Sequence, residues 1–172
     1  MVLKIAIELL LLLVFFQDLR ERAVFWILFP VLALSFLSYR LLRNDPVAAI
    51  CQAALVNIGF IAVVFLLLTA YFSVKRRKWT NVTDGLLGLG DLLFLLALCF
   101  YFSILNFLLF YITSLILVLA TWLIWRSVVK NSNEVPLAGL QAVLLAILLG
   151  LSWWVLPVDL TNDNWILRLM YN

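Results

Sequence analysis

Residues 44–79 read NDPVAAICQAALVNIGFIAVVFLLLTAYFSVKRRKW, and this stretch decides the fold class. From Pro46 to Val74 it contains no charged residue, and it exceeds the ~20 apolar residues that a helix needs to cross a bilayer. The polar residues before Pro46 supply a cap followed by proline at the first helical position, which predicts that a helix begins here. The basic cluster at 75–78 is typical of a helix end at a membrane surface. The stretch therefore predicts a transmembrane helix that runs to about Val74.

The rest of the chain has the same character. The 172 residues are 67% hydrophobic and 12% charged, whereas about a quarter of the residues in a soluble domain are charged. The net charge of +3 comes from short clusters at the ends of apolar runs, and no basic stripe with interleaved aromatic residues indicates nucleic acid. We therefore predict one integral membrane domain, residues 1–172, whose surroundings are the lipid bilayer and which binds no nucleic acid.

Five further helices are predicted from the apolar runs. They span about 3–16, 23–42, 136–156, and two helices within 85–125 that turn near 103–106. The tail from residue 157 is expected at the membrane interface, and Phe15-Phe16-Gln17 offers no small-residue cleavage site for a signal peptidase. The predicted fold is an all-α membrane protein, a bundle of about six transmembrane helices.

Basic residues predict the orientation of this bundle. With six helices, the loops after the first, third and fifth lie on one side of the membrane and both termini on the other. Those loops hold Arg20, Arg22, Lys75, Arg76, Arg77, Lys78, Arg126 and Lys130, and the other side holds Lys4, Arg40, Arg43 and Arg168. The positive-inside rule then predicts a multi-pass protein of the cell membrane whose basic loops face the cytoplasm.

The chain contains no histidine, which excludes several kinds of active site. A Ser-His or Cys-His nucleophile pair, an HExxH zinc site and a histidine-ligated haem all need an imidazole. Cys51 and Cys99 lie inside apolar segments without the paired spacing of a metal or redox motif, and we expect them to be packing residues. No metal or cofactor is predicted, and any hydrolytic chemistry falls to carboxylates.

Two aspartates are the candidates for that chemistry. Asp18 closes the first apolar segment, and Asp91 lies near the start of the fourth, in Gly88-Leu89-Gly90-Asp91. The two helices between them run across the membrane and back, so both aspartates should face the same side. If the fourth helix begins at Gly85, Asp91 lies roughly 9 Å along it. A carboxylate at that depth is costly unless it is paired or reached by water, which indicates a functional residue.

Paired carboxyls can hydrolyse a peptide bond by general acid-base catalysis. Two neighbouring carboxyls share a proton, so the charged one can take a proton from water while the neutral one donates to the scissile carbonyl oxygen. Gly88 and Gly90 would let a substrate strand approach the backbone and make a helix break beside Asp91 inexpensive. The alternatives are a solvated Asp18 balanced by Arg22 and a helix-packing notch formed by the two glycines.

Other polar residues have simpler interpretations. Asp84 is expected to be a loop charge or a helix cap, and Glu8 either pairs with Lys4 or is a second buried acid. Hydrogen bonds between helices are predicted for Asn57, Asn106 and Gln141.

Three motifs together resemble a known family. Gly88-Leu89-Gly90-Asp91 matches the GxGD motif of membrane aspartyl proteases, and Asp18-Leu19-Arg20-Glu21-Arg22-Ala23-Val24 resembles the first-aspartate motif of type IV prepilin and archaeal preflagellin peptidases. Val135-Pro136-Leu137-Ala138-Gly139 is similar to the proline-containing stretch that opens the last catalytic-core helix of that family. The motifs occur in the family's order along nearly the whole chain.

The resemblance implies that Asp18 and Asp91 are the catalytic pair of an aspartic endopeptidase. Residues that shape the site or bind substrate would be Gly88, Gly90, Arg20, Arg22 and Pro136. The substrate would be a pilin-like precursor, cut on the cytoplasmic side of its hydrophobic segment.

The chain departs from the family at three points. Phe25-Trp26 stands where the family has a proline or asparagine after the aliphatic residue of the first-aspartate motif. Leu92-Leu93-Phe94-Leu95 stands where a lysine usually follows GxGD, and no tetracysteine domain is present, which indicates a minimal form without methyltransferase activity. The alternative is a non-catalytic membrane scaffold or transporter subunit, a degenerate relative. A transporter usually contains paired broken helices, and only one break is predicted here.

Overall fold

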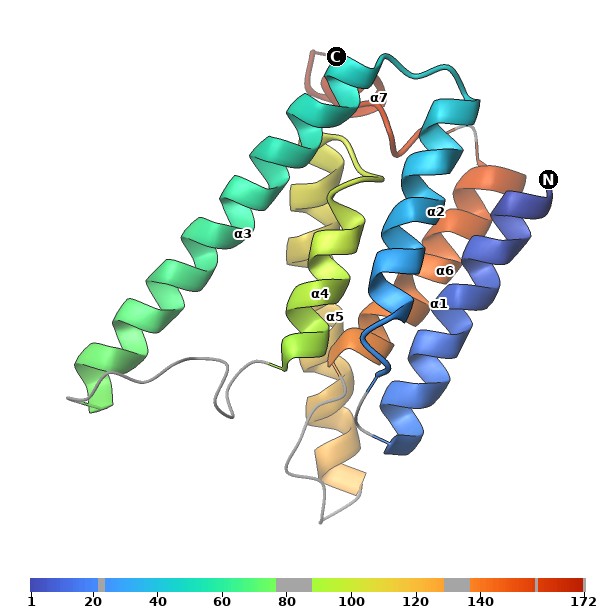
Figure 1. The fold of residues 1–172 in the computed structure, drawn as a ribbon. Helices are drawn as coiled ribbons and strands as arrows, with labels where there is room; N and C mark the ends of the chain where they lie inside the picture. The colour runs from blue at the N-terminus through green and yellow to red at the C-terminus, as the bar shows by residue number, and fades with distance from the viewer. Residues whose placement is uncertain (22–23, 77–87, 129–136, 157, 172) are drawn as a thin grey trace.

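A computed structural model describes residues 1–21, 24–76, 88–128, 137–156 and 158–171 (Figure 1). Within these ranges the chain is helical and contains no strand, which confirms the predicted all-α class. The helices are α1 (Val2–Glu21), α2 (Leu28–Leu42), α3 (Val47–Arg76), α4 (Leu89–Leu98), α5 (Ile104–Val128), α6 (Leu137–Trp154) and α7 (Asn164–Tyr171).

Three of the helices are long and apolar enough to cross a membrane. They are the segments Val47–Lys75, Ile104–Ile124 and Leu137–Trp154 of α3, α5 and α6. The apolar helices α2 and α4 have 15 and 10 residues, short of the ~20 that a span needs. The structure thus indicates a membrane protein, while the predicted count of six spanning helices is not confirmed.

The helices are arranged with the first, second and sixth side by side (Figure 1). The helix α1 packs along α6 and α2, and α4 packs against α2 and α6. The long α3 contacts α5 and α4 near its beginning and leans away from the other helices toward its end (Figure 1). The N-terminus and α7 lie at one end of the bundle, and the end of α1 and the starts of α4 and α6 lie at the other.

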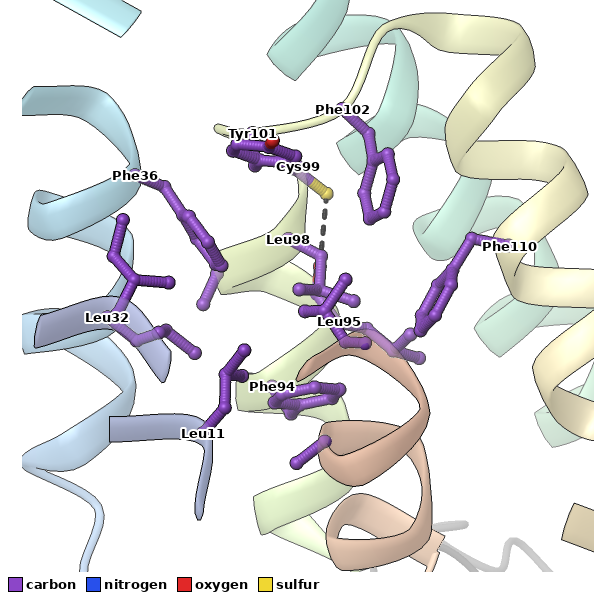
Figure 2. Close-up of a cluster of buried hydrophobic side chains, with 14 of the residues drawn as sticks. Leu11, Leu32, Phe36, Phe94, Leu95, Leu98, Cys99, Tyr101, Phe102 and Phe110 are labelled. Carbon is purple, nitrogen blue, oxygen red and sulfur yellow. Dashed lines mark hydrogen bonds between the residues drawn. The ribbon is translucent and has the colours of Figure 1, made fainter. Parts of the chain in front are cut away.

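A cluster of buried aromatic and aliphatic side chains holds α4 in the centre. Figure 2 shows Phe94 and Leu98 of α4 between Phe36 of α2 and Phe110 of α5. The rings of Phe102 and Phe110 stack with centroids 5.2 Å apart. In a bilayer such side chains stabilise the fold through close van der Waals packing, because lipid tails are as apolar as they are. This packing fixes the short helix that carries Asp91.

Two helix boundaries differ from the prediction in ways that affect the site. The helix α1 continues through Glu21, past its predicted end near residue 16, because the following Gln, Leu, Arg and Glu residues all favour helix. The helix α4 begins only at Leu89, because Gly88 has an extended backbone (φ −64°, ψ 137°). Asp91 therefore lies in the first turn of α4, and the predicted depth of roughly 9 Å along a helix from residue 85 is wrong.

The predicted hydrogen bond between helices is confirmed for Gln141, whereas Asn57 and Asn106 bond from a helix to a connecting segment. Asn57 Nδ2 donates to the Phe102 carbonyl at 3.3 Å, and Gln141 Nε2 donates to Ser114 Oγ at 3.1 Å. Asn106 Nδ2 donates to the Asn162 carbonyl at 3.0 Å. These bonds join α3, α5, α6 and the segment before α7 across otherwise apolar contacts.

The predicted pairing of Lys4 with Glu8 is wrong. Lys4 Nζ lies 5.3 Å from the centre of the Trp153 ring, and Glu8 Oε1 is buried without a hydrogen-bond partner. Of the two cysteines, Cys99 is buried as expected of a packing residue, whereas Cys51 is exposed on α3.

Ion pairs at the end of the bundle that holds the N-terminus were not predicted. Arg40 is buried, and its Nε donates to Asp45 Oδ2 at 2.9 Å. Arg43 donates to both carboxylate oxygens of Asp159, at 3.0 and 2.6 Å. The first pair lies within the α2–α3 corner. The second joins this corner to the segment between α6 and α7.

Candidate functional site

Asp18 lies in the last turn of α1 and faces α6. Its exposed fraction is 8%, low for a carboxylate near a helix end. The backbone N–H of Gly139 donates to Asp18 Oδ2, with a nitrogen–oxygen distance of 2.6 Å. The interpretation of Asp18 as a freely solvated surface charge is therefore wrong, because the side chain is buried between two helices.

Asp91 lies in the first turn of α4 and is partly buried. The backbone N–H of Gly88 donates to Asp91 Oδ2 at 3.3 Å, and the Asp91 N–H donates to the Gly88 carbonyl at 3.0 Å. The Asp91 carboxylate also lies near the backbone N–H of Ala138, at the start of α6. It is close enough to Asp18 for the two charges to interact.

The two carboxylates thus meet at the start of α6. The first four N–H groups of a helix have no partner within the helix and carry its positive dipole end. Here the N–H of Gly139 binds Asp18, and the N–H of the preceding residue, Ala138, lies near Asp91. The two carboxyl groups therefore both lie at the first turn of α6, close enough for their charges to interact. Three helices distant in sequence, α1, α4 and α6, converge on this point.

The two predicted glycines have different surroundings. A Cβ atom added to Gly88 would lie 3.1 Å from Asp91 Oδ2, tighter than an ordinary contact. A Cβ atom added to Gly90 would lie 3.7 Å from Phe29 Cζ of α2, an ordinary van der Waals distance. Gly88 therefore adjoins the carboxylate pair, and Gly90 packs against α2.

Arg20, a further predicted site residue within the described ranges, is not brought to the pair. Arg20 is exposed in the last turn of α1, and no hydrogen bond or ion pair among the described residues joins it to either carboxylate. Arg22, Pro136 and Asp84 lie outside the described residues.

Ala138 and Gly139 belong to the proline-containing motif, but the sequence alone predicted no role for either residue. The available signal was the proline at 136, which predicts a helix start and hence free N–H groups in the following residues. The motif does not predict which side chains these N–H groups contact.

Chemically, the site offers two adjacent carboxyl groups, each held by backbone N–H donors. No group of three or more Cys, Asp or Glu side chains that could hold a metal occurs in the part of the chain that the structure describes. Such a pair can exchange protons with water and with a polar substrate.

Comparison with known proteins found no matching family model, no matching curated protein and no matching solved structure.

Proposed function

We propose that this protein is a membrane-embedded aspartic endopeptidase that cleaves a precursor next to its hydrophobic segment. The observation that carries the proposal is the convergence of Asp18 and Asp91 on the first turn of α6, where Gly139 N–H binds Asp18 and the two charges interact. Paired carboxyls are an arrangement that can hydrolyse a peptide bond in a chain without histidine. The motif resemblance to prepilin and preflagellin peptidases supports the same activity.

The reaction follows from two carboxyls that share one proton. The ionised carboxyl takes a proton from a water molecule, which attacks the scissile carbonyl carbon, and the neutral carboxyl donates its proton to the carbonyl oxygen. Collapse of the tetrahedral intermediate breaks the C–N bond, and the leaving nitrogen receives a proton from the pair. The N–H groups of Gly139 and Gly88 keep Asp18 and Asp91, respectively, in place during these transfers.

The proposal includes an orientation in the cell membrane. We place the end of the bundle that holds Asp18 and Asp91 at the cytoplasmic face, because most basic residues belong to loops on that side. In this arrangement α1, α2 and α4 join the three long apolar helices in crossing the membrane. The substrate is a pilin-like precursor with a basic leader followed by a hydrophobic helix.

A structural role is the competing explanation for the same contacts. Asp91 caps α4 by accepting the Gly88 N–H, and Asp18 fastens α1 to α6. Asparagine can accept the same hydrogen bonds through its amide oxygen but cannot exchange protons. Substitution by asparagine therefore separates catalysis from structure.

The test measures cleavage of synthetic precursors in liposomes that contain the purified protein. The precursors carry a basic stretch, a glycine and a hydrophobic helix. We expect Asp18→Asn and Asp91→Asn each to reduce cleavage by roughly 10⁴-fold or more, as for residues that act as a unit. Glu8→Gln is the matched control, because Glu8 is a partly buried carboxyl of α1 away from the pair, and it should cleave normally. Undiminished cleavage by either asparagine variant, or no cleavage by the unmodified protein, would overturn the proposal.

A further inference from the structure

Gly139 approaches the root of the Asp18 side chain more closely than any larger residue would allow. A Cβ atom added at position 139 would lie 2.9 Å from Asp18 Cβ and 2.9 Å from Asp18 Oδ2. Real Cβ atoms essentially never come within 3.0 Å of another heavy atom. Because Asp18 Cβ is attached to the α1 backbone, rotation of the side chain cannot relieve this contact. A side chain at 139 would have to move α1 away from α6.

This closeness is local to the carboxylate pair. Gly150 lies about three turns further along α6 and, at ~3.6 residues per turn, on the same face. A Cβ atom added at Gly150 would meet Glu8 Oε1 of α1 at 3.7 Å, an ordinary distance. The α1–α6 packing therefore has room for a methyl group elsewhere along the same face.

The close approach allows the N–H of Gly139 to bind the Asp18 carboxylate. This N–H lies in the first turn of α6, where N–H groups have no partner within the helix, and it binds Asp18 Oδ2 at 2.6 Å. Asp91 is carried by a different helix, α4, and is held by the Gly88 N–H. A shift of α1 away from position 139 would therefore lengthen the Asp18 bond and change the separation of the two carboxyls.

We propose that Gly139 is a positioning residue, which sets the separation of the two carboxyls by letting α1 approach the start of α6. This inference rests on the proposed peptidase function. Gly139→Ala should lower kcat by ~100-fold, the effect of misplacing a reacting group by about 1 Å. The KM for the precursor should change little, because Gly139 contacts a carboxyl rather than the predicted substrate.

The kinetic test compares Gly139→Ala with Gly150→Ala in liposomes. Both variants add one methyl group to the same face of the same helix, and Gly150→Ala should retain the kcat of the unmodified protein. Equal kcat values for the two variants would overturn the positioning role. So would a loss of activity in Gly139→Ala that appears only as a raised KM.

A second test needs no catalysis and separates this inference from the proposed function. The melting temperature in detergent is measured for Gly139→Ala, Asp18→Gly and the double variant. Asp18→Gly removes the Cβ atom that position 139 would strike, so the loss caused by Gly139→Ala should largely disappear in that background. Additive losses would overturn the contact. If the contact holds but Asp18→Asn still cleaves, the proposed function fails while the packing of Gly139 against Asp18 stands.

Discussion

Gly88 and Gly90 are two residues apart, yet the absence of a side chain matters differently at each. We expect Gly88→Ala to reduce cleavage clearly, because its methyl group would push the Asp91 carboxylate by a few tenths of an ångström. Gly90→Ala should cleave nearly normally, because its methyl group would meet only Phe29 at an ordinary distance. Cleavage and melting temperature measured on the same preparations check this, and a larger catalytic loss in Gly90→Ala would contradict it.

Asn106 is the polar residue with the most hydrogen bonds in the described interior. Its Nδ2 donates to Ser103 Oγ at 2.7 Å and to the Asn162 carbonyl at 3.0 Å, and its Oδ1 accepts from Trp165 Nε1 at 3.1 Å. We expect Asn106→Ala to destabilise the protein by about 2–3 kcal/mol, because several buried groups lose partners.

The control for this prediction is Asn57→Ala. Asn57 makes one hydrogen bond, to the Phe102 carbonyl, and its removal should cost about 1 kcal/mol. Thermal unfolding in detergent gives both values. The prediction fails if Asn57→Ala is the more destabilising of the two.

At the residue scale, the two carboxylates could be predicted from the sequence, but the backbone N–H groups that hold them could not. The hairpin between Asp18 and Asp91 was enough to predict that both lie at the same end of the bundle. The contact of Asp18 with Gly139 depends on how α1 and α6 are aligned along each other, and both helices are apolar on nearly all sides. A one-dimensional pattern contains no information on that alignment.

The ion pair of Arg43 with Asp159 links two elements, the end of α2 and the segment between α6 and α7. Burial alone would raise the pKa of Asp159, but hydrogen bonds from Arg43 and Thr161 outweigh it and lower that pKa below its usual value. A carboxyl with a lowered pKa in the folded state contributes stability above its unfolded pKa, and this contribution is lost as the pH falls through the folded pKa.

We therefore expect Asp159→Asn to melt at a lower temperature than the unmodified protein near pH 7, and the difference to shrink as the pH falls toward ~3. The effect should stay below about 1 kcal/mol, because the side chains of Arg43 and Asp159 are 37% and 40% exposed. Thermal unfolding of both proteins across this pH range is the measurement. A difference that grows on acidification would contradict the assigned role.

At the element scale, hydropathy located every long helix but misplaced the ends that matter for the site. The first apolar run stops near Phe16, so hydropathy alone ended the helix there, although the polar residues after it continue α1 to Glu21. The start of α4 is set by the extended backbone of Gly88 rather than by the apolar run around it. Both errors concern the turns that carry Asp18 and Asp91.

For the whole molecule, the orientation can be tested by labelling. Arg20 is exposed in the last turn of α1, and Arg168 is exposed in α7. The fold places the end of α1 and α7 at opposite ends of the bundle (Figure 1). With the exposed Cys51 changed to serine, Arg168→Cys should react with a membrane-impermeant maleimide on intact cells, and Arg20→Cys only after permeabilisation. Labelling of both from the same side would contradict the proposed arrangement.

The order in which the chain is made also matters, because α6 supplies the N–H group that holds Asp18, and its first turn lies beside Asp91. A ribosome releases α1 and α4 into the membrane well before residue 139, so a nascent chain contains both aspartates without a formed pair. Under the proposed function, a half-synthesised molecule is inert, and so is a fragment truncated before α6. Unfinished copies would then cleave no other protein, because α6 is inserted after α1 and α4 and completes the site.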